Sequence, residues 1–312
     1  MSPSAVPDAC STAAALLGPR ARRHVPLGPL TTYRVGGAAS LFVEALDRED
    51  LEAVAAAVRA TDIPVLVVGR GSNLLVADEG FPGLAVVLGG AFAAIELDDG
   101  GVRAGGAVAL PVLARRCTAE GMRGLEWAVG VPGTVGGAVR MNAGGHGADV
   151  AGCLRGAAVF DLEGMPGAQP GWRTPAELAL GYRSSGLGPR QIVVEAVFVL
   201  APGSRAEGEA QLAEIVRWRR ANQPGGANAG SVFANPPGDS AGRLIEAAGL
   251  KGHRRGSAFV SPRHANFFQA DQVGSAGDVA ALIDEVRTAV AECFGVELVP
   301  EVRLVGFEQP SS

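Results

Sequence analysis

Cysteine is scarce in this chain, with four among 312 residues. They stand at Cys10, Cys117, Cys153 and Cys293, so no two are close enough for a CxxC motif or for metal-ligand spacing. We therefore predict no metal site. A reduced, cytoplasmic compartment fits this cysteine usage best.

Long apolar runs and excess positive charge are also missing. No stretch is long enough to span a membrane, and the net charge of −5 argues against nucleic acid as a partner. The segment 1–23 is unlike a signal peptide, because its apolar run is short and its basic residues follow that run. We expect a tail and a short helix there.

Two familiar phosphate-binding motifs are absent as well. The turn at 69–73 (GRGSN) follows an apolar run, but Leu74 stands where a Rossmann fingerprint needs its third glycine. No Gly-Lys-Ser/Thr occurs, so a P-loop is excluded. What remains is a strand–turn–strand whose backbone N–H groups could cradle a pyrophosphate, or a plain tight turn.

Glycine, in contrast, is abundant, with 45 residues and no collagen period. Seven glycines lie between 130 and 147, where so little side-chain bulk lets a backbone approach a ligand closely. Two such loops favour one long ligand, such as a dinucleotide, that bridges both. A merely flexible region is the alternative for the second loop.

Hydrophobic periodicity predicts a mixed α+β protein, and 312 residues with 47% hydrophobic content suffice for two domains. A polar stretch near 203 marks the expected boundary. We predict helices at 48–60, 110–121, 240–249 and 276–293, a further helix ending at Trp218, and strands at 64–69, 74–78, 155–161, 191–200, 265–269 and 296–307.

Seven motifs in order carry a resemblance to a known family. They are TTYRVGG (31–37), VVGRGSNLLV (67–76), GVPGTVGGAVRMNAGGHG (130–147), GYRSS (181–185), AGSVFANPPGDSAGRLIEAAGLKG (229–252), HANFF (264–268) and GVELVPEVRLVG (295–306). Over residues 28–307 the chain resembles the UDP-N-acetylenolpyruvoylglucosamine reductases, flavoenzymes of peptidoglycan precursor synthesis and hence of cell-wall biogenesis, cell shape and cell division.

The resemblance implies an architecture. It implies a two-part FAD-binding domain of the vanillyl-alcohol-oxidase type at 29–202 and a smaller α+β substrate-binding domain at 203–307. Segments 1–28 and 308–312 then form an N-terminal tail with a short helix and a C-terminal tail. The branch with the shorter connection between GYRSS and the strand at 191 is the one resembled, and we expect a monomer.

The resemblance also implies the cofactors: FAD, bound without a covalent bond, and NADPH as co-substrate. The positions that match the family's FAD-binding residues are Tyr33, Arg34, Gly69, Arg70, Gly71, Ser72, Asn73, Leu74, Gly130, Pro132, Gly133, Thr134, Gly136, Gly137, Asn142, Ala143 and Gly144.

Three positions match the family's catalytic residues. Arg183 is implied to hold the substrate carboxylate, a task that suits an always-charged guanidinium. Ser231 is implied to donate a proton to carbon. Glu301 is implied to share the charge stabilisation, so it should be protonated or hydrogen-bonded through a donor, with a pKa raised by burial. Without the resemblance, Arg183 and Glu301 would be ordinary strand-end ion-pair residues, and Ser231 a turn serine.

Four further residues are candidates for substrate binding: Tyr182, Asn235, Arg243 and Lys251. Ala234 departs from the family pattern, because a basic residue is frequent at its position. The implied reaction is the reduction of an enol ether carrying a carboxylate. Two alternatives stay open at this point, a flavin oxidase or dehydrogenase of the same fold and a nucleotide-sugar-binding protein without catalysis.

Overall fold

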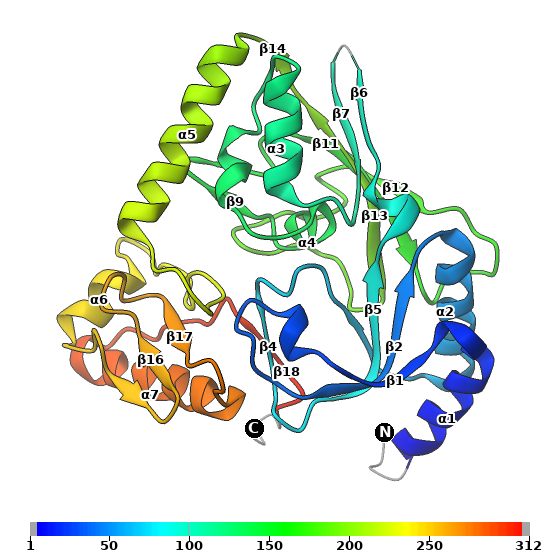
Figure 1. Ribbon diagram of the computed structural model, residues 1–312, viewed down its shortest axis with the longest axis horizontal. Helices are drawn as coiled ribbons and strands as arrows, with labels where there is room; N and C mark the ends of the chain where they lie inside the picture. The colour runs from blue at the N-terminus through cyan, green and yellow to red at the C-terminus, as the bar shows by residue number, and fades with distance from the viewer. Residues whose placement is uncertain (1–4, 99, 308–312) are drawn as a thin grey trace. The chain divides into compact units, whose positions relative to one another are not determined.

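The computed structural model describes residues 5–98 and 100–307 (Figure 1). The predicted tail at 308–312 and the first four residues lie outside the described chain. Two compact units are present. The first takes in residues up to Arg23, Ser40–Arg70 and Gly83–Trp218, and the second takes in His24–Ala39, Gly71–Pro82 and the chain from Arg219 onward. The domain limits at 29–202 and 203–307 stay a prediction.

A four-stranded sheet with two helices forms one layer pair (Figure 1). Its order is β1 (Arg22–Pro26), β2 (Ala38–Ala45), β5 (Phe81–Leu88) and β3 (Val65–Val67), and β3 pairs with β5 in parallel. Helices α1 (Ala5–Leu17) and α2 (Arg48–Thr61) pack on one another and share a buried core with the strands.

The ends of α2 follow from its sequence, and the prediction of a helix at 48–60 is confirmed. The Asp47 carboxylate accepts a hydrogen bond from the Asp50 amide, as an N-cap residue does. Asp62 ends the helix in the left-handed conformation, with φ of 53°. Leu51, Val54 and Val58 form the buried face.

A five-stranded antiparallel sheet forms the other part of the first unit (Figure 1). Its order is β12 (Gly171–Arg173), β11 (Leu154–Asp161), β13 (Gln191–Val199), β7 (Gly101–Gly105) and β6 (Ile95–Asp98). Helices α3 (Leu110–Ala119), α4 (Val135–Arg140) and α5 (Arg205–Asn222) contribute to its core. Helix α5 begins at Arg205, within the polar stretch that marks the predicted boundary.

The short elements of this unit connect the sheet to its helices. They are the 3₁₀ turns η1 (Gly18–Arg20), η3 (Gly90–Ala93) and η4 (Glu126–Gly130), and the two-residue strands β8 (Met122–Arg123), β9 (Gly144–Gly145), β10 (Ala148–Asp149) and β14 (Ala201–Pro202). Strand β8 pairs with β14, and β9 pairs with β10 as a tight hairpin.

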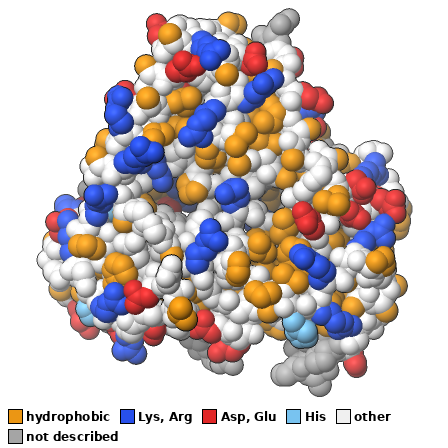
Figure 2. Space-filling view, viewed as in Figure 1, with side chains coloured by type: hydrophobic (Ala, Val, Ile, Leu, Met, Phe, Trp, Pro, Cys, Tyr) orange, Lys and Arg blue, Asp and Glu red, His pale blue; other side chains and the backbone are white. Residues whose placement is uncertain are grey.

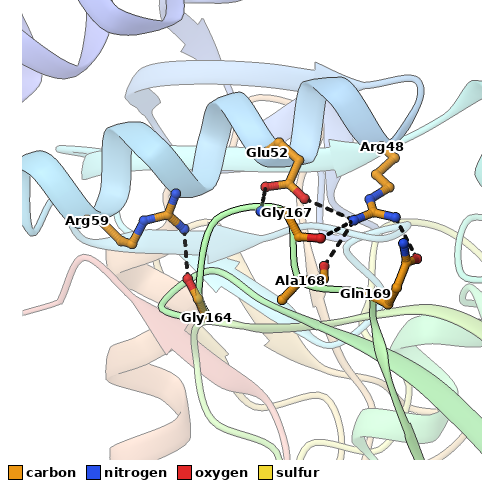
Figure 3. Close-up of polar contacts among 7 residues, drawn as sticks. All are labelled: Arg48, Glu52, Arg59, Gly164, Gly167, Ala168 and Gln169. Atoms are coloured by element: carbon orange, nitrogen blue, oxygen red, sulfur yellow. Dashed lines mark hydrogen bonds and ion pairs between the residues drawn. The ribbon is translucent and has the colours of Figure 1, made fainter.

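The loop at 162–170, between β11 and β12, lies against α2 (Figure 3). Arg48 donates from Nη2 to the carbonyl oxygens of Gly167 (2.9 Å) and Ala168 (3.1 Å), and Arg59 donates to that of Gly164 (3.0 Å). These carbonyls lie outside the sheet ladder, so the arginines satisfy acceptors that the strands do not. Within the first unit, these contacts join α2, which packs on the four-stranded sheet, to the β11–β12 hairpin of the five-stranded sheet.

The second unit is built around α7 (Ala276–Phe294). The predicted apolar stripe is confirmed, because Val279, Leu282, Ile283, Val286 and Val290 are all buried. The other elements are η2 (Gly28–Leu30), α6 (Ala241–Ala247), the strands β15 (Arg254–Arg255), β16 (Ala258–Val260) and β17 (Phe268–Ala270) of a small sheet, and the parallel pair β4 (Leu74–Val76) and β18 (Arg303–Val305).

The prediction of one strand over 296–307 is wrong, because only Arg303–Val305 forms a regular strand. Pro300 has no amide hydrogen, so a ladder cannot continue through it. The segment pairs with different partners before and after Glu301. The Ala234 amide donates to Val299 O (2.9 Å) and the Glu301 amide donates to Val232 O (2.8 Å), while β18 pairs with β4.

The surface shown in Figure 2 carries Lys and Arg side chains spread among acidic, hydrophobic and neutral ones. The most exposed large hydrophobic side chains, Val273 and Met165, stand on separate loops. Among the described helices, none is both long and apolar enough to cross a membrane.

Asp78 stabilises the first turn of α7 from outside the helix. Its carboxylate accepts hydrogen bonds from the Ser275 hydroxyl (2.6 Å) and from the amides of Ala276 (2.9 Å) and Gly277 (3.0 Å). Burial alone raises the pKa of Asp78, but these hydrogen bonds outweigh it and hold the pKa below its ordinary value. The ionised form is therefore the one that stabilises the fold.

Replacing Asp78 by Asn should lower the free energy of unfolding by about 1 kcal/mol at neutral pH. Because the folded pKa is depressed, the stabilisation is present above the unfolded pKa of about 4 and is lost as the pH falls through the folded value. Urea unfolding at several pH values should show wild type and variant converging below about pH 4. Asp284→Asn, at an exposed carboxylate on α7, is the control; a gap that stays constant with pH contradicts the role of Asp78.

Candidate active site

The two glycine loops predicted to hold a cofactor meet within the first unit. A Cβ added at Gly69 would lie 2.7 Å from Oγ1 of Thr134. That oxygen already accepts the Gly137 amide (3.2 Å) and caps α4. At Gly136 a Cβ would lie 3.0 Å from Val193 O. The second loop is thus pressed onto the sheet, and bare backbone is what lets it approach the first loop.

The rest of the first loop packs against the TTYR segment within the second unit. Gly71 has φ of 58°, and a Cβ there would lie 2.3 Å from Leu30 O. The Thr32 amide donates to Gly71 O at 3.3 Å. In the described chain, the amides of Arg70, Ser72 and Asn73 donate to no other protein group. Amides presented in this way suit the oxygens of a pyrophosphate.

Buried polar groups in the same segment have no protein partner. Tyr33 is fully buried, and among the described residues neither its hydroxyl nor Oγ1 of Thr32 finds a hydrogen-bond partner. Burial raises the pKa of Tyr33, so the phenol is neutral. An unsatisfied buried group costs about 1–3 kcal/mol, which a ligand that supplies the missing hydrogen bond recovers. The residues present therefore fit FAD, and each predicted contact stays a prediction.

Arg183 lies in the first unit, in a tight turn closed by hydrogen bonds in both directions between Gly181 and Ser184 (3.0 and 3.3 Å). Its φ of 53° is in the left-handed region, which a turn of this kind ordinarily gives to glycine or asparagine. Such strain persists where the surroundings hold it. Here Nη2 of Arg183 donates to Gly144 O (3.0 Å), and the guanidinium lies over the Tyr182 ring.

The side chain of Asn142 hydrogen-bonds to this turn. It is buried, its Nδ2 donates to Gly181 O (2.9 Å) and to the Asp149 carboxylate, and its Oδ1 accepts the Ala151 amide (2.9 Å). Each polar atom of the side chain thus has a protein partner. A cavity of about 480 Å³ lies beside it, lined by Trp127, Gly144 and Arg183 among others, all from the first unit.

Ser231 and Glu301 lie together in the second unit, joined through the backbone. The Glu301 amide donates to the carbonyl of Val232, the residue after Ser231. Glu301 O accepts from Nδ2 of Asn73 (2.9 Å), so a residue predicted for the cofactor also holds the glutamate's main chain. Both Ser231 and Glu301 are half-buried. Among the described residues, the Ser231 hydroxyl donates to no protein acceptor.

The remaining substrate-binding candidates lie around α6, where acidic side chains pair with the basic ones. Arg243 contacts Asp239 (Nε to Oδ1, 2.6 Å), and this hydrogen bond is the main cause that lowers the pKa of Asp239 to about 2. Lys251 contacts Glu246 (2.7 Å). Asn235 accepts the Ala241 amide at the start of α6 (3.1 Å). An anionic ligand here has to compete with these carboxylates.

One residue with a clear place in this arrangement was missed by sequence reasoning. Asn266, in the HANFF motif, is 3% exposed and hydrogen-bonds to the backbone of Phe233, two residues after Ser231. The signal available in the sequence was a polar residue between apolar neighbours, Ala265 and Phe267, both of which are buried. A buried asparagine needs partners, but the sequence does not say which.

Gly69→Ala should yield a protein that carries much less FAD, because the new Cβ overlaps Oγ1 of Thr134. Removing that oxygen as well, in Gly69→Ala/Thr134→Ala, should restore part of the FAD content. Gly225→Ala is the matched control, since a Cβ there meets no atom within 4 Å. The measurement is flavin absorbance per protein after purification; equal FAD content in all three variants contradicts the close approach.

Comparisons with known proteins agree with this geometry. A family model described as an FAD binding domain matches residues 39–165, and one described as the C-terminal domain of UDP-N-acetylenolpyruvoylglucosamine reductase matches residues 222–305. The matches confirm the predicted α+β class, with an FAD-binding domain followed by a smaller domain.

Relatives that match along most of the chain point to the same family. A UDP-N-acetylenolpyruvoylglucosamine reductase of Symbiobacterium thermophilum is 46% identical over 92% of this chain and 92% of its own length, and one of Heliobacterium modesticaldum is 45% identical over 90% and 89%. The crystal structure of the Thermus caldophilus enzyme, 38% identical, covers 91% of this chain and 99% of that one with a TM-score of 0.78. The chain therefore belongs to the UDP-N-acetylenolpyruvoylglucosamine reductase family and is an FAD-dependent oxidoreductase.

Proposed function

We propose that this chain reduces UDP-N-acetylglucosamine enolpyruvate to UDP-N-acetylmuramate with NADPH, as a step of peptidoglycan precursor synthesis. The observation that carries the proposal is the hydrogen bond from the Glu301 amide to Val232 O, which places Glu301 and Ser231 on neighbouring backbone segments. An oxidase of the same fold has no evident need for that pair. The relatives named for this reaction extend along nine-tenths of the chain.

The chemistry requires a hydride at one alkene carbon and a proton at the other. Bound FAD, when reduced, supplies the hydride. Arg183 pairs with the substrate carboxylate and stabilises the negative charge that develops on that side. Its planar guanidinium can bind a carboxylate through two parallel hydrogen bonds, and the held turn limits the reorganisation needed when the charge appears.

Ser231 donates the proton from Oγ to the carbon that bears the carboxylate. A hydroxyl is a weak acid, so the donation depends on close placement and on prompt recovery of a proton from a neighbour or solvent. Glu301 shares the stabilisation of charge in its protonated form, because an ionised carboxylate would repel an enolate. Arg243, Lys251, Asn235 and Tyr182 are the proposed contacts to the rest of the substrate.

A cytoplasmic location, a monomeric state and the lack of nucleic-acid or membrane partners stay predictions. So do the individual FAD contacts at the two glycine loops. The Asp239–Arg243 and Glu246–Lys251 pairs bear on the substrate contacts, since these arginine and lysine side chains can bind phosphate only by exchanging a carboxylate partner.

Ser231→Ala should separate the two half-reactions. Reduction of the flavin by NADPH should stay within about twofold, whereas reoxidation by the enol ether should slow by about 10²–10⁴-fold, the usual contribution of a positioned acid. Ser231→Cys, which keeps a proton donor of similar size, should recover part of the rate. Anaerobic stopped-flow absorbance measures both steps; an equal loss in both would remove the proton-donor role.

A further inference from the structure

Asn266 is buried just before β17, and its side chain pairs with the backbone of Phe233. Its Oδ1 accepts the Phe233 amide (3.0 Å) and its Nδ2 donates to the Phe233 carbonyl (2.8 Å). The orientation of the amide is fixed, because a backbone N–H can only meet the oxygen. One side chain therefore satisfies both polar groups of a buried residue.

The main chain of the same residue adds a third contact. The Val232 amide donates to Asn266 O (2.8 Å), and Ser231 itself forms an antiparallel bridge with Phe267. Val232 and Phe233 are both buried, at 0% and 1% exposure. The two residues that follow Ser231 are thus held by hydrogen bonds and by packing at once, which fixes the direction in which the Ser231 side chain leaves the backbone.

The opposite edge of this short segment holds Glu301. Val232 O accepts the Glu301 amide (2.8 Å) and the Ala234 amide donates to Val299 O (2.9 Å). The segment 231–234 therefore runs between 266–267 on one side and 299–301 on the other. A shift of Phe233 is therefore transmitted to Ser231 through the peptide chain and to Glu301 through the hydrogen bond at Val232 O.

We propose that Asn266 is a positioning residue for the proton transfer. Its side-chain amide holds Phe233, and through it the adjoining Val232, where the Ser231 hydroxyl can deliver a proton and where the Glu301 backbone stays in register with it. The inference rests on the proposed function, since it needs Ser231 to be the donor. It extends that function by a residue that touches neither substrate nor cofactor and acts through the backbone of its neighbours.

The test uses the FAD-loaded enzyme and two variants. Asn266→Ala removes both side-chain bonds to Phe233, and Asn266→Asp is isosteric, keeps the acceptor for the Phe233 amide and loses the donor. Gln269→Ala is the matched control, since its amide also contacts a loop carbonyl, Gly225 O at 2.7 Å, but on the segment before Ser231 rather than on the residues that follow it. Each protein is measured for FAD content, flavin reduction by NADPH, and reoxidation by UDP-N-acetylglucosamine enolpyruvate.

Both Asn266 variants should keep FAD content and NADPH reduction within about twofold, while reoxidation slows by about 10–100-fold, as displacements of about 1 Å do in active sites. In the Ser231→Ala background, Asn266→Ala should add less than about twofold, because the hydroxyl that it positions is gone. The control should lose less than about twofold in every step.

Three outcomes overturn the inference. Equal losses in both half-reactions mean that Asn266 serves only the fold. Losses that multiply with those of Ser231→Ala mean that it acts independently of the hydroxyl. If Ser231→Ala alone leaves reoxidation unchanged, Ser231 is not the proton donor and the proposed function is wrong. The positioning role of Asn266 is then wrong as well. This result differs from the first two outcomes, which overturn the role of Asn266 alone.

Discussion

The cofactor region depends on one constraint: at several positions the backbone packs so closely on its neighbours that only glycine fits. In the first unit Gly69 approaches the Thr134 hydroxyl, and in the second unit Gly71 approaches Leu30 O more closely than any Cβ allows. Several amides of the first loop have no protein acceptor among the described residues. This requirement explains why glycine is abundant in the two short loops.

The proposed chemistry depends on a second backbone arrangement. Val232 and Phe233 are held from one side by Asn266 and from the other by the segment around Glu301. Pro300 interrupts what would otherwise be a longer strand, and the pairing changes partner at Glu301. The proline thus ends one pairing just before Glu301, whose amide hydrogen-bonds to the residue after Ser231. Asn73, which donates to Glu301 O, connects the glycine turn to the same point.

Elements with a strong local period could be predicted from the sequence. The helix with the Val279–Val290 stripe and the helix capped by Asp47 were both confirmed, because their burial pattern and caps depend on residues close together in the sequence. The division of 296–307 between two partners could not be predicted, since it depends on which distant segments offer acceptors. Asn266 was missed for the same reason, as its role exists only through contacts with Phe233, 33 residues away.

The central claim is that this chain transfers reducing equivalents from NADPH through FAD to an enol ether. Anaerobic stopped-flow absorbance of the wild-type holoenzyme tests it most directly. NADPH should bleach the flavin, and UDP-N-acetylglucosamine enolpyruvate added afterwards should restore its absorbance with formation of one UDP-N-acetylmuramate per flavin. A flavin that stays reduced with the enol ether and is reoxidised only by oxygen would contradict the account.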